Sequence, residues 1–190
     1  MKNIITAFLF LIFYQTGVAQ SYIPTIKNNT VLHYLCKLHG QTRTLSLRAQ
    51  TAEDKLTFKL ETRGVKSSIV MLGEAVKNGN ALSFNQGEYA PELHLKPTET
   101  FFMISQSAYE DLLKNSSFRY NNTQYVLDEN QDKNGVFIEG KLIDALHVIA
   151  QIDQTEMWIV KNPQFPLICK ITKNPLGINF TLVDVVDQVN

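Results

Sequence analysis

The sequence predicts a mainly β (α+β) fold, a curved antiparallel sheet or half-barrel wrapped around one central helix. Three observations predict it. Short runs of β-branched, aromatic and alternating apolar residues recur along the chain, separated by turn-forming residues. Only one segment, residues 98–116, has the apolar spacing of a helix. Several strand-like runs are apolar on both faces, so something must cover both sides of the sheet.

The N-terminal segment has the pattern of a secretory signal peptide. One cation, Lys2, precedes an apolar run, and Gly17 and Ala19 stand just before a cut at Gln20. The apolar run ends well short of the ~20 residues that span a bilayer. A bacterial lipoprotein needs a cysteine at the cut for lipid attachment, and no cysteine lies near the cut here. We therefore expect residues 1–19 to be cleaved and the mature chain to be periplasmic or secreted, with no stable membrane span.

Residues 20–190 have the length of a single β-rich half-barrel domain. A chain of this size buries roughly 68–70% of the surface of its extended form, so its core needs neither a metal nor a disulfide. Without Lys2 the 18 basic residues become 17, against 18 acidic ones, and no block of like charges is present. Nucleic acids and anionic membranes gain little from such a surface, so we expect no nucleic-acid partner.

The two cysteines, Cys36 and Cys169, both lie in strand-like apolar runs. If their strands are neighbours, an oxidising compartment lets them pair, and the closed loop stabilises the chain by ~4–5 kcal/mol in the chain-entropy model. The alternative is two buried free thiols that pack as small hydrophobic groups. The sequence leaves both alternatives open.

The first half of the domain predicts a series of short strands. Strict alternation over residues 55–63 places three large apolar side chains on one face, the pattern of a half-buried strand. Residues 44–50 alternate in the same way, and "TAED" joins the two runs as a hairpin. Residues 30–38 are apolar on both faces, and so is the run at residues 68–72. A further short strand follows at residues 81–85.

Residues 98–116 predict the one main helix. Ser107 followed by Glu110 fits a capping box, after which apolar residues share one face at helical spacing. The helix can instead begin near Thr98, and in either case it covers part of the sheet. In that second alternative the buried stripe consists of Phe101, Ile104, Ala108 and Leu112.

The second half continues the pattern of short strands and predicts an antiparallel meander. Its runs are "GVFIEGKLIDALHVIAQI", "EMWIVK", "LICKIT" and "INFTLVDVV". Two Asn-Pro pairs, Asn162-Pro163 and Asn174-Pro175, separate the last three runs. Proline lacks an N–H and pushes the preceding residue out of the helical region, and asparagine tolerates turn geometry. We therefore expect these pairs, with Gly177, to be corners of the sheet.

No motif for catalysis or metal binding is present. The histidines, His33, His39, His94 and His147, show no metal-ligand spacing, and the chain has no G-x-S-x-G, P-loop, G-x-G-x-x-G or C-x-x-C motif. Cys169 lies in a buried strand pattern, where a thiol is usually inert. We therefore expect no catalytic residue, no metal site and no cofactor.

The strands that are apolar on both faces include residues 145–150 and 156–160. The helix covers part of the second face, and either loops fill the rest of the concavity or a curved sheet encloses an apolar ligand there. The segment "TFFMI", residues 100–104, is a core plug in the first case. In the second it is an adaptable flap, to which Met103 supplies plasticity.

The stretch from Gly140 to Val186 carries a resemblance to a known family. It contains Leu146-His147, then Trp158, then the first Asn-Pro pair, "PLI" and "NPLG", over about a quarter of the chain. With strands around one helical segment behind a signal peptide, it resembles the LolA-like half-barrel periplasmic proteins. These comprise the outer-membrane lipoprotein carrier and a related group of uncharacterised domains, to which this stretch is similar. In the carrier branch the resemblance implies an apolar concave surface that holds acyl chains without covalent chemistry.

We therefore predict a non-catalytic extracytoplasmic binding or carrier protein for a hydrophobic ligand such as a lipid or acyl chain. Two other classes compete with it. One is a hydrolase that uses His33 or His147 with a carboxylate brought close by folding. The other is a scaffold whose exposed sheet edge pairs with an envelope protein. The candidate ligand-binding residues are large apolar side chains, chosen for size and not from a motif: Phe58, Phe101, Phe102, Met103, Trp158 and Phe180.

Overall fold

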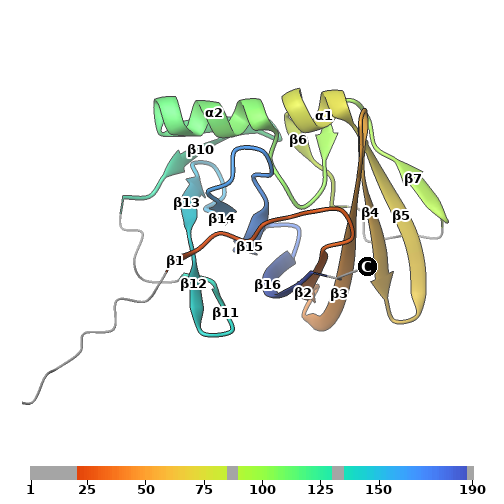
Figure 1. The fold of residues 1–190 in the computed structure, drawn as a ribbon. Coiled ribbons are helices and arrows are strands. Elements are labelled where there is room, and N and C mark those ends of the chain that lie inside the picture. The colour runs from red at the N-terminus through yellow and green to blue at the C-terminus, as the bar shows by residue number, and fades with distance from the viewer. Residues whose placement is uncertain (1–20, 85–89, 130–134, 188–190) are drawn as a thin grey trace, which may run out of the picture.

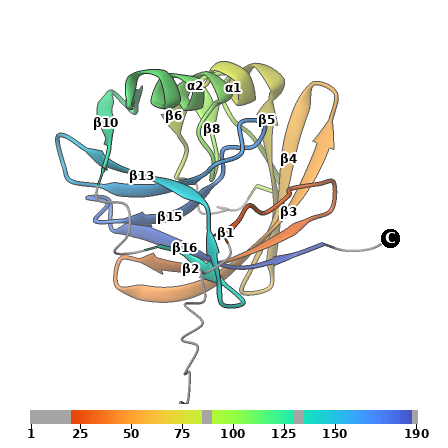
Figure 2. The ribbon, with the colours of Figure 1, turned by 60° about the vertical axis from the view of Figure 1, so that its left-hand side comes forward.

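The structure is a computed structural model that describes residues 21–84, 90–129 and 135–187. Its main element is an 11-stranded sheet that curves around a common interior without closing into a barrel (Figures 1 and 2). All neighbouring strands are antiparallel except β5 and β7, which are parallel. In spatial order the strands are β7 (Glu92–His94), β5 (Val65–Leu72), β4 (Lys55–Thr62), β3 (Gln41–Ala52), β2 (Val31–Leu38), β16 (Ile178–Val186), β15 (Ile168–Thr172), β14 (Glu156–Val160), β13 (Ala145–Ala150), β10 (Thr123–Leu127) and β9 (Ser117–Tyr120).

The mainly β prediction is therefore confirmed, and so is the antiparallel character of the sheet. The alternation in β4 works as expected, because Leu56, Phe58 and Leu60 are buried. The two halves of the chain join where β2 pairs with β16, which sets Cys36 opposite Phe180. A local sequence pattern cannot predict this pairing, since it connects strands from opposite ends of the domain.

Two small sheets complete the strand pattern. One contains β1 (Ser21–Tyr22), β12 (Lys141–Ile143) and β11 (Phe137–Ile138). The other pairs β6 (Ala81–Leu82) with β8 (Glu99–Thr100) in parallel. The backbone N–H of Asn121 donates to the carbonyl of Asn80 at 2.9 Å, and its side-chain oxygen accepts from the Leu82 N–H at 2.8 Å. These bonds tie β6 to the β9–β10 turn at one edge of the large sheet.

Two helices, α1 (Gly73–Asn78) and α2 (Gln106–Asn115), lie together at one end of the sheet, which we call the helix end (Figure 1). The β2–β3 and β4–β5 turns, at residues 39–40 and 63–64, lie at the opposite end, the hairpin end. Both predicted starts of the main helix are wrong. Ser105 is the N-cap, and its hydroxyl accepts from the Ala108 N–H at 3.2 Å.

A central helix is not confirmed, because residues 100–105, which we call the plug segment, occupy the interior without helical structure. Phe101, Phe102, Met103 and Ile104 are all buried. Backbone bonds hold the segment against the start of β15: the Ile168 N–H donates to the Phe102 carbonyl at 2.8 Å. Helix formation would remove this bond, which explains why the apolar spacing of these residues misled the helix prediction.

Side-chain bonds fix the two ends of the plug segment. The hydroxyl of Thr100 donates to the Met103 carbonyl at 2.6 Å and lies 2.7 Å from the hydroxyl of Tyr120. That tyrosine hydroxyl also accepts from the Ser105 N–H at 3.1 Å. Since all of these groups are buried, each bond prevents the cost of an unsatisfied polar group in the core.

The Asn-Pro pairs lie where the sequence placed them, between β14 and β15 and between β15 and β16. The side-chain oxygen of Asn162 accepts from the Phe165 N–H at 3.2 Å, and that of Asn174 accepts from the Leu176 N–H at 2.8 Å. Gly177 has φ +68°, a conformation that favours glycine. These residues shape corners by local hydrogen bonds and backbone angles.

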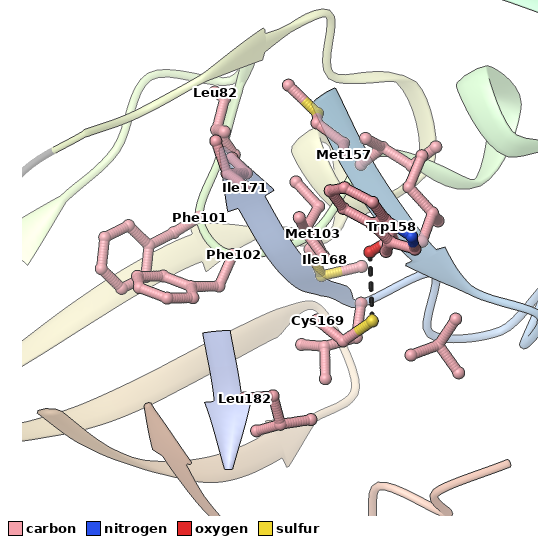
Figure 3. Packing of buried hydrophobic residues seen from close by; sticks show 14 of the residues in the cluster. Leu82, Phe101, Phe102, Met103, Met157, Trp158, Ile168, Cys169, Ile171 and Leu182 are labelled. Carbon is pink, nitrogen blue, oxygen red and sulfur yellow. Dashed lines mark hydrogen bonds between the residues drawn. The ribbon is translucent and has the colours of Figure 1, made fainter. Parts of the chain in front are cut away.

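Of the two alternatives for the cysteines, the structure shows two free thiols and no disulfide between them. Both Cys36 and Cys169 are buried and unpaired in the structure. The Cys169 thiol donates to the Trp158 carbonyl at 3.3 Å, as Figure 3 shows. Burial raises the pKa of Cys36 to about 11 and that of Cys169 to about 12. Both therefore stay protonated at neutral pH and act as packing groups.

Candidate ligand-binding site

A cavity lies at the hairpin end of the curved sheet, between its inner face and the plug segment. Its volume is about 50 Å³. Strands β2, β3, β4 and β16 form one wall, residues after β6 form another, and Phe101 and Phe102 from the plug segment form the inner wall. The aliphatic residues that line it are Leu38, Leu45, Leu60, Leu82 and Ile178. Leu38, Leu45 and Leu60 are inward members of strands of the large sheet, in which alternate side chains share one face.

Aromatic side chains pack together along the inner wall of this cavity. The ring of Phe102 stacks on Phe180 with centroids 4.2 Å apart, and it lies 4.5 Å from Tyr34 and 4.7 Å from Phe101. Figure 3 shows Phe101 and Phe102 side by side. Such tilted and offset pairs contribute about 0.5–1.5 kcal/mol each beyond their buried area. Phe84 also lines the cavity.

Phe102 has φ +55°, in the left-handed region that a bulky L-residue rarely adopts. Holding a residue there costs on the order of 1–3 kcal/mol, which the surrounding contacts must offset. The bond from the Ile168 N–H to the Phe102 carbonyl and the aromatic contacts supply that compensation. The strained residue of the plug segment thus also has a ring that borders the cavity.

One cation lies among the cavity residues. Arg43 is half-buried on the inner face of β3, opposite Cys36 of β2. Its Nη2 donates to the side-chain oxygen of Gln41 at 2.9 Å, while its buried Nε has no hydrogen-bond partner among the described residues. Its guanidinium therefore faces an apolar cavity with a neutral partner and a spare donor.

The predicted lining residues divide into three groups. Phe101, Phe102 and Phe180 line the cavity. Phe58 and Met103 are fully buried in the layer behind it: Phe58 lies 6.2 Å from the Phe101 ring, and Met103 forms a β-bridge with Leu167. The third group is Trp158 alone, which lies on the other face of the sheet.

Sequence reasoning missed the aliphatic lining and Arg43. The alternation of β3 carried the signal: Arg43 shares the inward parity of Leu45 and Leu47, which the sequence predicted to face inward. A cation at an inward position of an otherwise apolar face could have been identified before the structure.

A second group of side chains lies on the outer face, around Trp158. The His147 ring stacks on the indole with centroids 4.2 Å apart, and the Lys170 ammonium lies 4.2 Å from the centre of the Trp158 ring. Nδ1 of His147 lies 3.0 Å from an Asp128 oxygen, and its Nε2 lies 3.6 Å from an oxygen of Glu156. The cross-strand register of β13, β14 and β15 brings His147, Trp158 and Lys170 into one row.

The charges of this outer cluster compensate one another. Burial raises the pKa of Glu156, but the hydrogen bond and charge of Lys173, with smaller effects of His147 and Thr172, outweigh it and lower the pKa overall. Burial lowers the pKa of Lys170, against the attraction of Glu156. The indole Nε1 of Trp158 is buried without a hydrogen-bond partner among the described residues.

His33, the other histidine considered for the competing hydrolase class, also lies on the outer face. Its Nδ1 is 2.9 Å from the hydroxyl of Ser46 on β3, and Asp184 is its cross-strand partner on β16. In the described ranges, no group of three or more His, Cys, Asp or Glu side chains is arranged to hold a metal ion. Neither helix of the described chain has the length and apolar character of a membrane span.

Fold and cavity together define a mainly β protein with a half-barrel-like sheet and a small apolar cavity at one end. Comparisons of the chain with protein-family models, with curated proteins and with solved structures find no match in any of the three. The resemblance to LolA-like half-barrel proteins therefore stays a prediction that rests on strand and turn residues. What the protein binds must be argued from its cavity.

Proposed function

We propose that the protein is a non-catalytic periplasmic or secreted carrier that binds a hydrophobic ligand, a lipid or an acyl chain, in the cavity at the hairpin end. The observation that carries this proposal is the strained Phe102 beside an apolar cavity. Strained residues persist where the surroundings hold them, and they concentrate at ligand clamps and switch regions.

The volume of the cavity explains why the plug segment must take part. Binding sites for small molecules occupy about 300–1,000 Å³, well above the about 50 Å³ observed here. A bound acyl chain therefore needs Phe102 to leave its place against Phe180. When Phe102 leaves, its backbone strain is relieved, and this relief lowers the net free energy needed to open the cavity.

The ligand replaces the lost aromatic contacts with its own apolar surface. Each Å² of apolar surface removed from water stabilises the complex by roughly 25 cal/mol. In this proposal the plug segment is the adaptable flap of the LolA-like half-barrel, and the signal peptide delivers the protein to the compartment where it meets lipid.

A pair of tryptophan substitutions tests the proposal. Leu45→Trp fills the cavity from the inner face of β3, and Leu35→Trp places the same side chain on the outer face of β2, where Leu35 is 39% exposed. The mature protein is titrated with a neutral fluorescent acyl probe. We expect saturable binding by the wild type and Leu35→Trp, and its loss in Leu45→Trp while the melting temperature is kept. Absence of saturable binding by the folded wild type refutes the proposal.

A hydrolase is the second candidate, because His147 lies between the carboxylates of Asp128 and Glu156. A histidine whose ring nitrogens face carboxylates can act as a general base. The test is ester hydrolysis by the purified wild type and by His147→Ala. Hydrolysis that the substitution abolishes, in a protein that takes up no acyl probe, reverses the order of the two candidates.

A further inference from the structure

We infer that the cavity takes an amphiphile with one acyl chain and an anionic head group, and that the guanidinium of Arg43 binds that head. This inference rests on the proposed function and deepens it by naming the ligand class. It starts from the position of Arg43, which lines the apolar cavity instead of pointing into solvent from the outer face.

The first argument is the lack of a counter-charge. No carboxylate is among the described residues that line the cavity; besides Arg43, the only ionisable side chain there is Cys36, whose raised pKa keeps it neutral. By contrast, Lys66, Lys96, Lys161 and Lys173 each have an acidic partner within 4.0 Å. A half-buried guanidinium without an anion loses hydration and receives no ion pair in return.

The second argument is unused hydrogen-bonding capacity. A guanidinium has five N–H donors, arranged to grip the two oxygens of a carboxylate or phosphate. Arg43 donates through Nη2 to the neutral amide oxygen of Gln41, two residues away on the same strand, and its buried Nε has no partner among the described residues. Since Gln41 is exposed, its amide can turn into water when an anion arrives.

The third argument is the direction of the cavity. Arg43 is half-buried near the β2–β3 turn, whereas Phe102 and Phe180 are buried, with Phe180 in the same cross-strand row as Cys36 and Arg43. The hydroxyl of Thr62, which also lines the cavity, already donates to the Thr44 carbonyl at 2.9 Å. An acyl chain that enters towards the aromatic wall thus leaves its head beside Arg43. The small volume favours one chain over two.

Competition against the neutral acyl probe tests the head-group preference. The competitors share one chain: lauric acid, lauryl alcohol and lauroyl lysophosphatidic acid, each below its aggregation concentration, at a pH where the acids are ionised. We expect at least one anionic ligand to bind about tenfold more tightly than the alcohol, the effect of one charge-assisted bond pair. A preference for lauric acid assigns a carboxylate head, and a preference for the lysophospholipid assigns a phosphate head.

Matched variants connect the preference to Arg43. Arg43→Gln removes the charge, Arg43→Lys keeps it without the planar donor pair, and Lys37→Gln removes an exposed cation from the outer face of β2. We expect Arg43→Gln to erase the preference for the anion and leave alcohol binding within about twofold, and Arg43→Lys to restore part of it. Lys37→Gln should behave as wild type.

Three results overturn the inference. If the wild type binds the alcohol as tightly as the anions, the head group is not recognised, although the proposed carrier function stands. If Arg43→Gln weakens alcohol and anion equally, Arg43 only supports the cavity wall. If no ligand with this chain displaces the probe, the ligand class is wrong; and if the probe itself does not bind, the proposed function fails with it.

Discussion

The inner cavity around Arg43 and the outer cluster around His147 both place an ionisable side chain beside aromatic rings, yet they treat its charge differently. On the outer face, His147 lies between Asp128 and Glu156, and Glu156 in turn pairs with Lys173. On the inner face, Arg43 lines a cavity together with leucines and phenylalanines. Charges that are paired with opposite charges contribute to the stability of the fold. A cation that faces an apolar cavity without an anion is available to bind a ligand.

The largest expected effect concerns the outer cluster. Trp158→Ala should lower the free energy of unfolding by about 3–5 kcal/mol, because it removes a buried indole from between His147 and Lys170. Urea unfolding measures the loss, and probe titration at low temperature measures binding by the folded variant. If the outer cluster serves only the stability of the fold, the folded variant binds the probe as tightly as wild type. Weaker binding by a fully folded variant means that the outer cluster and the cavity are coupled.

Gly177 tests whether the corner beside the cavity acts through the fold. Gly177→Val should cost on the order of 1–3 kcal/mol, since φ is +68° and an added Cβ lies 3.2 Å from Nδ1 of His39. The control is Leu176→Val, at an exposed neighbour where no strain arises. Loss of probe binding should follow the loss of folded protein in thermal melts. Unchanged stability with abolished binding makes the corner part of the binding site.

Phe102 is the residue at which the cavity itself can be altered. Phe102→Ala removes the ring that stacks on Phe180, so the acyl probe no longer has to displace it. We expect probe affinity to rise about tenfold, the change produced when a displacement cost of about 1.4 kcal/mol disappears. Phe58→Ala is the control, because Phe58 is buried behind Phe101 and does not line the cavity. An affinity that stays the same or falls in Phe102→Ala contradicts the flap.

The smallest effect is a pH dependence in the outer cluster. Because the pKa of Glu156 is lowered in the folded state, its ionised form stabilises the fold above the unfolded pKa of about 4.3. That contribution disappears as the pH falls through the folded pKa. Unfolding is measured between about pH 5 and about pH 3, the range in which carboxyl groups ordinarily titrate. Over this range the free energy of unfolding should fall less for Glu156→Gln than for wild type, by under about 1 kcal/mol. An equal loss in both proteins means that the ion pair with Lys173 adds nothing.

The sequence predicted most strands but not the helix start or the second helix. Alternation in β4 places its side chains correctly because each strand position decides its own face. Residues 98–105 have helical spacing, yet Phe102 and Ile104 bond to the chain around Pro166 and Ile168. Those partners lie more than sixty residues away in the sequence, and a local pattern contains no information about them.

The candidate site shows the same division. Size and apolarity were enough to select Phe101, Phe102 and Phe180, because large apolar side chains collect in the interior of any curved sheet. The same criterion selected Trp158, which lies on the outer face beside His147. Burial of Trp158 does not distinguish the two faces, since the strands here are covered on both sides.

By itself the sequence determined the class of fold, the corners at the Asn-Pro pairs and the inward parity of the alternating strands β3 and β4, because these follow from local backbone preferences and from a period of two residues. Only the tertiary structure decided that β2 pairs with β16, that residues 100–105 fill the interior and that Arg43 faces a cavity with no counter-charge among the described residues that line it. Each of these depends on which distant strands become neighbours. Which strands become neighbours depends on the apolar surface that the whole folded chain buries, and no single segment of the sequence carries that information.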